Sequence, residues 1–339
     1  MNHQCIAPVG RREFLRGVTL TGTAAILGAR PGPVAAEPPP ETTKLRLARV
    51  SSICRAPQYM TEELLHSEGF SDVEYLARAG TAGVAKAVAA GDIDITMQYV
   101  GPSIMQVDSG KHVIVLCGIQ PGCFELFGTE RVRSVRDLKG KTVAADTTGS
   151  AYTFLASMLT YVGLNPRKDI KLVAHAGTEA MRLLAEGRID GFLALPPEPQ
   201  ELRARNIGHT VINSIVDRPW SQYFCCMVVG NREFVRKHPI ATKRALRAIL
   251  KAADICAADP ARAARILVDK GYTERYDYAL QALKDIPYNK WREYDHEDTV
   301  RFYALRLHEA GMIKSSPQKI IAQGTDWRFL KELKKELKS

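Results

Sequence analysis

The chain has 339 residues, of which 45% are hydrophobic and 25% are charged, and its formal net charge is +10. These fractions suit a globular protein of about two domains and exclude a disordered chain, which needs fewer apolar residues. No apolar run reaches the roughly 18 residues of a membrane span, and no basic run is interleaved with aromatic residues. We therefore expect neither a membrane-spanning nor a nucleic-acid-binding protein.

The first 36 residues have the features of an export signal. Arg11 and Arg12 precede a weakly hydrophobic stretch, residues 17–29, that is too short to span a bilayer. Short side chains at residues 34–36 then offer a cleavage site, and paired arginines in this position are typical of twin-arginine signals. We predict that residues 1–36 are a signal peptide cleaved near Ala36, which implies a periplasmic protein. A buried amphipathic N-terminal helix is the alternative.

After a Pro/Glu/Thr-rich flexible leader at residues 37–44, short apolar runs alternate with helical patterns. This alternation predicts βαβ units and a mainly parallel sheet. The expected strands are 45–50, 73–76, 93–97, 113–116, 141–145, 170–173 and 189–195, and the helices between them are 58–67, 81–90, 102–109, 150–162 and 179–186. Further helices are expected at 233–238, 242–258, 260–271 and 298–310, and the charged segment 331–338 is expected to be a solvated helix face with i,i+4 pairs.

A weak internal repeat indicates two similar halves. Residues 88–94 (VAAGDID) match residues 184–190 (LAEGRID), and in both segments a helix ends at a glycine before a strand begins. The aspartates of these segments, Asp92, Asp94 and Asp190, are expected to be solvated turn and strand residues.

Six cysteines follow the predicted signal, without a C-x-x-C pair or any other metal-binding spacing. Cys225 and Cys226 lie in an apolar segment, residues 223–229, and should be buried thiols on opposite faces of a strand. Cys117 and Cys123 flank a Pro-Gly turn, where either a disulfide or two free thiols would fit.

Taken in order, several segments resemble the periplasmic solute-binding proteins of the nitrate/sulfonate/taurine group (NMT1/THI5-like) of ABC transporters. The segments that carry this resemblance are AGDIDI (90–95), YVGP (99–102), SVRDLKGKTV (134–143), GSA (149–151), AEGRIDGF (185–192) and VVGNREF (228–234). The resemblance implies an α/β fold of two doubly wound lobes joined by two crossover strands, the type II periplasmic binding protein fold. Lobe one would comprise residues 45–127 plus 227–290 and lobe two residues 134–220, with 291–339 as C-terminal helices on lobe one.

The strongest candidate for ligand contact is the start of the helix predicted at 150–162. Unpaired amides at this helix start, with the hydroxyls of Thr148 and Ser150, would form an anion site, although simple N-capping would use the same groups. Gly80 and Thr81 stand similarly before a helix. The full set of predicted ligand-binding residues is Ser52, Ile53, Cys54, Gly80, Thr81, Tyr99, Gly101, Thr148, Gly149, Ser150, Tyr152, Pro196, Glu198 and Gln222.

Several of these positions have a second interpretation. Tyr99 could stack on a solute or pack in the core, and Glu198 could meet a cation or begin a helix on the favourable side of its dipole. Cys54 could be a cleft-lining thiol or the nucleophile of a desulfinase-like enzyme.

The resemblance implies a function in import rather than catalysis. A small anionic solute, such as a sulfonate, nitrate or taurine-like compound, or a pyrimidine-like compound, would be captured by hinge closure and delivered to an ABC permease in the inner membrane. No cofactor, metal or nucleic acid is expected, and the protein should be a monomer. A desulfinase-like enzyme and a binding protein that presents its solute to a sensor are the alternatives.

Overall fold

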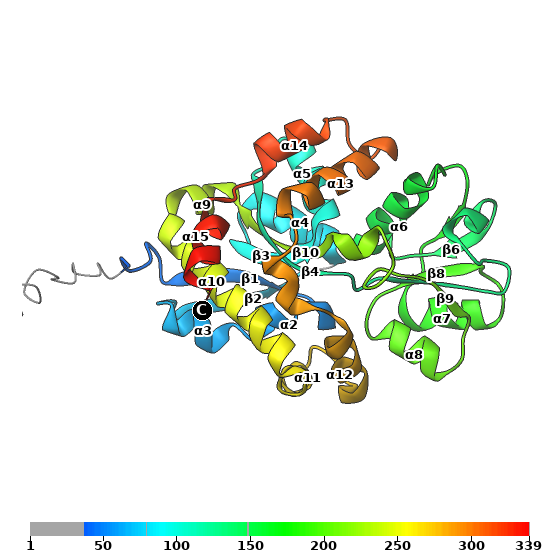
Figure 1. Ribbon diagram of the computed structural model, residues 1–339, viewed down its shortest axis with the longest axis horizontal. Coiled ribbons are helices and arrows are strands. Elements are labelled where there is room, and N and C mark those ends of the chain that lie inside the picture. Colours follow the sequence, from blue (N-terminus) through cyan, green and yellow to red (C-terminus); the bar gives the residue numbers. More distant parts are fainter. Residues whose placement is uncertain (1–36, 79, 148, 339) are drawn as a thin grey trace, which may run out of the picture. The chain divides into compact units, whose positions relative to one another are not determined.

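The computed structural model describes residues 37–338 except 79 and 148, so the predicted signal peptide lies outside the described residues. All elements below belong to one compact unit, Pro39–Ser339 (Figure 1). Within the predicted flexible leader, Glu41 is fixed, because its carboxylate accepts hydrogen bonds from the amides of Ile240 and Ala241 at the start of a long helix. None of the helices in the described range is long and apolar enough to cross a membrane.

The strands form three sheets. The first pairs β1 (Lys44–Arg49) in parallel with β2 (Asp72–Ala77). In the second, β10 (Phe224–Asn231) runs antiparallel to β3 (Ile95–Tyr99) on one side and to β4 (Val113–Pro121) on the other. The third has the order β7-β6-β8-β5-β9 and consists of β5 (Glu125–Gly128), β6 (Thr142–Ala144), β7 (Lys171–Val173), β8 (Gly191–Ala194) and β9 (His209–Asn213).

Helices surround these sheets in two groups, which we call lobes. Lobe two is the five-stranded sheet with α6 (Ser150–Tyr161), α7 (Gly177–Ala185) and α8 (Glu198–Ala204), drawn in green in Figure 1. Lobe one contains the other two sheets and the remaining helices. These are α2 (Ala56–Tyr59), α3 (Glu62–Ser67), α4 (Gly80–Ala90), α5 (Val100–Asp108), α9 (Arg232–Lys237), α10 (Pro239–Ala258), α11 (Pro260–Asp269), α12 (Tyr276–Asp285), α13 (His296–Glu309), α14 (Pro317–Gly324) and α15 (Arg328–Glu336).

The expected mainly parallel sheet is only partly correct. Pairing is parallel for β1 with β2 and for β6 with β7 and β8, but β10 and β5 run antiparallel to both of their neighbours. The chain enters β5 from lobe one and β10 from lobe two, so neither strand is reached through a helical crossover of its own sheet. Only parallel neighbours require such a crossover, which explains why the βαβ pattern does not extend to these strands.

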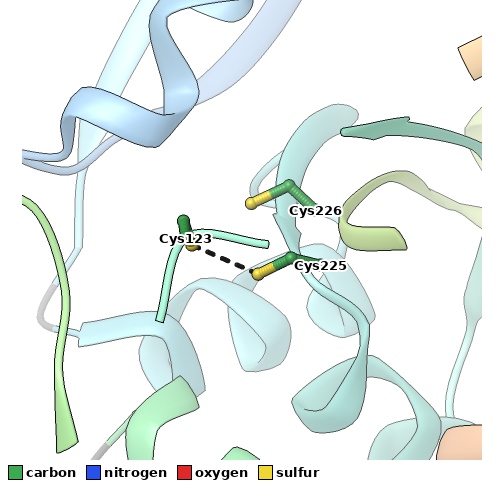
Figure 2. A group of neighbouring side chains, drawn as sticks. All are labelled: Cys123, Cys225 and Cys226. Atoms are coloured by element: carbon green, nitrogen blue, oxygen red, sulfur yellow. Dashed lines mark hydrogen bonds between the residues drawn. The ribbon is translucent and has the colours of Figure 1, made fainter. Parts of the chain in front are cut away.

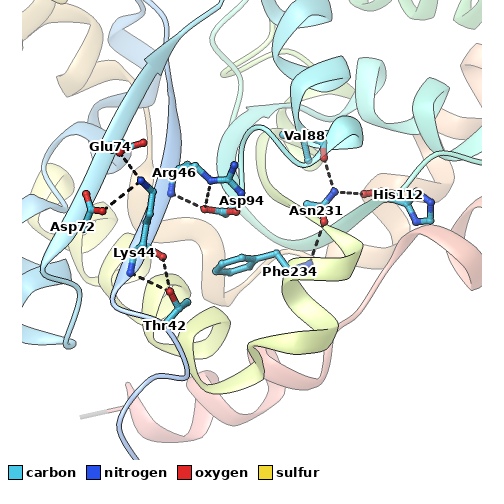
Figure 3. A network of polar contacts seen from close by, with 10 residues as sticks. All are labelled: Thr42, Lys44, Arg46, Asp72, Glu74, Val88, Asp94, His112, Asn231 and Phe234. Atoms are coloured by element: carbon cyan, nitrogen blue, oxygen red, sulfur yellow. Dashed lines mark hydrogen bonds and ion pairs between the residues drawn. The ribbon is translucent and has the colours of Figure 1, made fainter.

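The expectation that Asp94 and Asp190 are solvated is wrong, because each carboxylate lies just before one strand and is hydrogen-bonded to another: Asp94, before β3, is bonded to β1, and Asp190, before β8, is bonded to β6. Asp94 accepts hydrogen bonds from the backbone amide of Arg46 at 2.7 Å and from its guanidinium (Figure 3). Asp190 accepts one from the amide of Thr142 at 3.0 Å and forms an ion pair with Arg131. The internal repeat is therefore a structural device that is used once in each lobe.

Two buried amide side chains, Gln58 and Asn231, join neighbouring elements of lobe one. The predicted helix 58–67 is divided into α2 and α3, and Gln58 in α2 donates to the carbonyl of Ala48 on β1 and accepts from the amide of Met97 on β3. At the other end of lobe one, Asn231 caps α9 by accepting from the Phe234 amide and donates to the carbonyl of Val88 (Figure 3). The Gln58 contacts join β1 to β3, and Asn231 fixes the end of β10 to α4 and α9.

The large hydrophobic core extends from lobe one into α6 of lobe two, while a smaller core underlies the five-stranded sheet. Phe154 on α6 is fully buried and packs against Tyr99, Phe124 and Tyr303. At the C-terminus, α15 is the expected charged helix, but its ion pairs differ from the predicted pattern. Glu336 pairs with Arg247 on α10, so this charge joins two helices rather than two turns of one helix.

Candidate functional site

A cavity of about 170 Å³ lies where the loops of the two lobes meet. Its walls come from residues that follow the carboxyl ends of β1, β3, β6 and β8, from the starts of α4 and α6, from β10 and from the loop between β4 and β5. Open α/β sheets place their ligands at this edge. The lining residues are Val50, Ser51, Ser52, Cys54, Arg55, Gly80, Thr81, Tyr99, Cys123, Phe124, Asp146, Ser150, Ala151, Leu195, Cys225 and Cys226.

The cavity brings together part of the predicted site. The predicted residues that line it are Ser52, Cys54, Gly80, Thr81, Tyr99 and Ser150. The others that the structure describes do not line it: Ile53, Gly101, Gly149, Tyr152, Pro196, Glu198 and Gln222. Thr148 lies outside the described residues.

The starts of α4 and α6 meet across the cavity, one from each lobe. The hydroxyl of Ser150 donates a hydrogen bond to the hydroxyl of Thr81 at 2.8 Å, which joins the two lobes directly. Gly149 makes this approach feasible, because a Cβ at that position would lie 2.7 Å from Oδ2 of Asp146 and 3.0 Å from Oγ1 of Thr81. Each helix also directs its first amides and the positive end of its dipole toward this region, an arrangement that favours an anion.

Arg55 adds a full positive charge to the same wall. It ends the short 3-10 turn Ile53–Arg55 that follows β1, and only 3% of its surface is exposed. Its Nη1 atom is buried and has no hydrogen-bond partner in the part of the chain that the structure describes. A buried guanidinium nitrogen without a partner is costly, and a carboxylate, sulfonate or nitrate oxygen would satisfy it with a charge-assisted hydrogen bond.

Tyr99 packs in the core, one of its two expected interpretations, and it also lines the cavity. Its ring lines the cavity and also packs edge-on against Phe124, Phe154 and Tyr303. Burial raises the pKa of Tyr99 well above its ordinary value, which keeps the phenol protonated. Gly101 contributes by packing rather than by lining the cavity, because a Cβ there would lie 2.6 Å from the Tyr99 ring.

Glu198 organises lobe two. Its carboxylate accepts hydrogen bonds from the amides of Leu195 at 2.9 Å and Gly177 at 2.8 Å, which joins the starts of α8 and α7. Burial raises the pKa of Glu198 to about 7. Ile53 and Pro196 line a neighbouring groove that also contains Tyr272, and Gln222 is exposed.

The side chains of Cys123, Cys225 and Cys226 lie close together (Figure 2), and all three residues line the cavity. The expectation that Cys225 and Cys226 face opposite sides of a strand is wrong, because the pairing of β10 with β4 shifts register at this point and the bulge turns both sulfurs the same way. Cys117 and Cys123 are free thiols, and Cys123 faces Cys225 instead. Hydrogen bonds from Cys123 and Cys225, together with the nearby Arg55 charge, hold the pKa of Cys226 well below its ordinary value.

Arg55 and the Cys123/Cys225/Cys226 cluster are the main features that the sequence prediction of the site missed. Arg55 directly follows the predicted residue Cys54, so a basic residue in a loop proposed to bind an anion was a signal that could have found it. Cys123 and Cys225 lie far apart in the chain, and nothing in their local sequence indicates that they meet.

The family of the chain follows from comparison with known proteins. Residues 38–268 match the model of the NMT1-like family. The chain belongs to the NMT1-like family. This confirms the resemblance drawn from the sequence motifs. No curated protein matches the chain.

Several solved structures share the fold of this NMT1-like protein. The periplasmic nitrate-binding protein NrtA from Synechocystis PCC 6803 has a TM-score of 0.72 at 15% identity, covering 88% of this chain and 90% of its own. The periplasmic sulfonate-binding protein SsuA from Methylobacillus flagellatus KT has a TM-score of 0.66 at 20% identity, covering 87% of this chain and 94% of its own. The periplasmic aliphatic sulphonate-binding protein SsuA from Escherichia coli has a TM-score of 0.66 at 16% identity, covering 83% of this chain and 96% of its own. The fold is that of the type II periplasmic binding proteins, as predicted.

Proposed function

We propose that this NMT1-like protein is an extracytoplasmic solute-binding protein of an ABC importer. It captures a small anionic solute between its lobes and delivers the closed complex to an inner-membrane permease. The family assignment and the fold of the nitrate- and sulfonate-binding proteins support this function. The N-terminal arginine pair, followed by a short apolar stretch, supports export to the periplasm.

The observation that carries the proposal is the buried guanidinium of Arg55 in a cavity shared by both lobes. Its Nη1 atom has no partner among the described residues, and the start of α6 supplies further donors from the opposite lobe. An anion held between these groups contacts both lobes at once, so its binding energy favours the closed arrangement. Asp146 lines the same cavity, so a solute that also carries an amine would place unlike charges near both side chains.

The test is a thermal-shift titration of the purified chain. The panel contains nitrate, ethanesulfonate, taurine, benzoate and a neutral pyrimidine, and a ligand at about 100 times its Kd adds about 2.7 kcal/mol to the free energy of unfolding. We expect an anion to raise the Tm, and Arg55→Met to abolish that rise. Arg167→Met, an exposed arginine that does not line the cavity, is the matched control and should respond like the wild type.

Two results would contradict the proposal. One is a panel in which a neutral compound raises the Tm and no anion does. The other is an Arg55→Met variant that is folded and binds the anion as tightly as the wild type.

The alternative of a desulfinase-like enzyme has less support. Cys54 lines the cavity, but the described lining residues include neither a histidine nor a lysine that could activate its thiol. We propose that the protein is not an enzyme. A Cys54→Ala variant that keeps full solute affinity, with no turnover of a sulfinate by either form, would remove the enzymatic alternative.

A further inference from the structure

Three cysteine thiols from two distant parts of the chain meet on one wall of the cavity (Figure 2). Cys123 lies in the loop between β4 and β5, and Cys225 and Cys226 lie in β10. Their sulfur atoms all lie within 4.8 Å of one another, and those of Cys123 and Cys225 are 3.2 Å apart. All three side chains are buried free thiols.

Two irregularities of the backbone create this cluster. The register shift in β10 turns the adjacent residues Cys225 and Cys226 toward the same side, where a regular strand would alternate them. Cys123 has a φ of 151°, a conformation that side-chain-bearing residues rarely adopt. Such a conformation is strained and is concentrated at functional sites. Both irregularities serve to bring sulfur atoms together.

We propose that Cys123, Cys225 and Cys226 bind one soft divalent cation of the Zn²⁺ type through three thiolates. Thiolate sets select such cations over Mg²⁺ and Ca²⁺. Zn–S bonds of about 2.3 Å place the sulfurs of a three- or four-coordinate site about 3.8–4.0 Å apart. The sulfurs of Cys123 and Cys225 are 3.2 Å apart and all three sulfurs lie within 4.8 Å of one another, so bringing the Cys123–Cys225 pair to this spacing needs side-chain shifts of about 0.6–0.8 Å.

The charges of the site also balance. Binding releases one proton from each thiol, transfers no electron and leaves a complex with one negative charge. The guanidinium of Arg55 lines the same cavity and offsets that charge. The three ligands leave the cavity side of the ion open, as in sites where zinc takes a further ligand from the solvent or from a bound molecule.

The experiment is a Co²⁺ titration of the purified chain, fully reduced and kept under nitrogen so that no disulfide consumes the ligands. We expect one equivalent of Co²⁺ to produce an intense thiolate-to-cobalt absorption band, and Zn²⁺ to displace it. Cys123→Ala and Cys226→Ala should weaken Zn²⁺ binding at least about 100-fold, more than the loss of an outer contact to a metal ligand. Cys117→Ala and Cys256→Ala, which remove buried thiols outside the cluster, are the matched controls.

Reduced wild-type protein without the band would overturn the proposal, as would a band that Cys117→Ala removes and Cys226→Ala retains. If the cluster variants do not fold, the wild-type titration decides alone. The titration contains no solute, so its result is independent of the test of the proposed function.

Discussion

The carboxylate of Asp94 provides a sharp test of how lobe one is held together. It accepts hydrogen bonds from the Arg46 amide at 2.7 Å and from the Arg46 guanidinium, and only 3% of its side chain is exposed. Asp94→Ala removes all of these interactions at the junction of β1 with β3.

The expected cost follows from the two kinds of interaction that this substitution removes. A backbone amide left without its partner costs about 1–3 kcal/mol. The Arg46 side chain is 32% exposed and can turn toward water, so the ion pair adds only about 1 kcal/mol. We therefore expect Asp94→Ala to lower the free energy of unfolding by about 2–4 kcal/mol, measured by urea denaturation followed by circular dichroism.

Two other aspartates of the internal repeat are the controls. Asp92 is 57% exposed and 3.6 Å from its partner Arg78, so Asp92→Ala should change the free energy of unfolding by no more than about 0.5 kcal/mol. Asp190→Ala should have an intermediate effect, because its carboxylate is 15% exposed. If Asp94→Ala were as harmless as Asp92→Ala, the carboxylate would not join the strands as we infer.

Three further substitutions test the site and its surroundings. Gly149→Ala should weaken binding of the solute found by thermal shift by about 10-fold or more, because the added Cβ obstructs the approach of the lobes. The control is Gly83→Ala, whose Cβ would meet nothing within 4 Å and which should leave the affinity unchanged. Equal affinities of the two variants would contradict this prediction. Burial raises the pKa of Glu198 to about 7, so the folded state loses stability as pH rises from 4.5 to 7. In urea denaturation, the free energy of unfolding of Glu198→Gln should therefore rise by about 2 kcal/mol relative to wild type over that interval. A difference between the two proteins that stays constant with pH would refute the assignment. Burial lowers the pKa of His296 to about 3, and its Nδ1 accepts a hydrogen bond from the Gly118 amide. The free energy of unfolding should therefore fall as pH drops from 6.5 toward 3, and His296→Gln should flatten that fall. A variant with the pH profile of the wild type would contradict this prediction.

The sequence predicts the alternation of strands and helices well, because hydrophobic periodicity and glycine stops are local signals. The expected strand 93–97 and helix 150–162 correspond to β3 and α6 within two residues at each end. The direction of β5 and β10 was not predictable in the same way, because it depends on which lobe the chain has just left.

For the candidate site, the sequence identified the loops that line the cavity better than it identified the individual side chains. Thr81 and Ser150 lie at the starts of two helices, as predicted, and their side chains meet because helix starts after strands face the same edge of the fold. Cys123 acquires its role from partners on β10 that are distant in sequence, and Asp94 seemed solvated only because its partner on β1 could not be identified. Long-range pairs of this kind leave no pattern in a single sequence.

The packing of α6 against lobe one determines how the cavity can open. This helix begins next to the five-stranded sheet, but Phe154 lies in the core of the other lobe, and α6 packs against α5 and α13. Pulling Phe154 out would expose apolar surface at about 1.5–3 kcal/mol for that ring alone. The cheaper motion keeps Phe154 in place and rotates α6 about it, so the helix start at Ser150 moves with the rest of its lobe and the outer edge strand β7 would travel farther than the strands next to the hinge. Distance labels on β7 would therefore register opening more strongly than labels placed near Phe154.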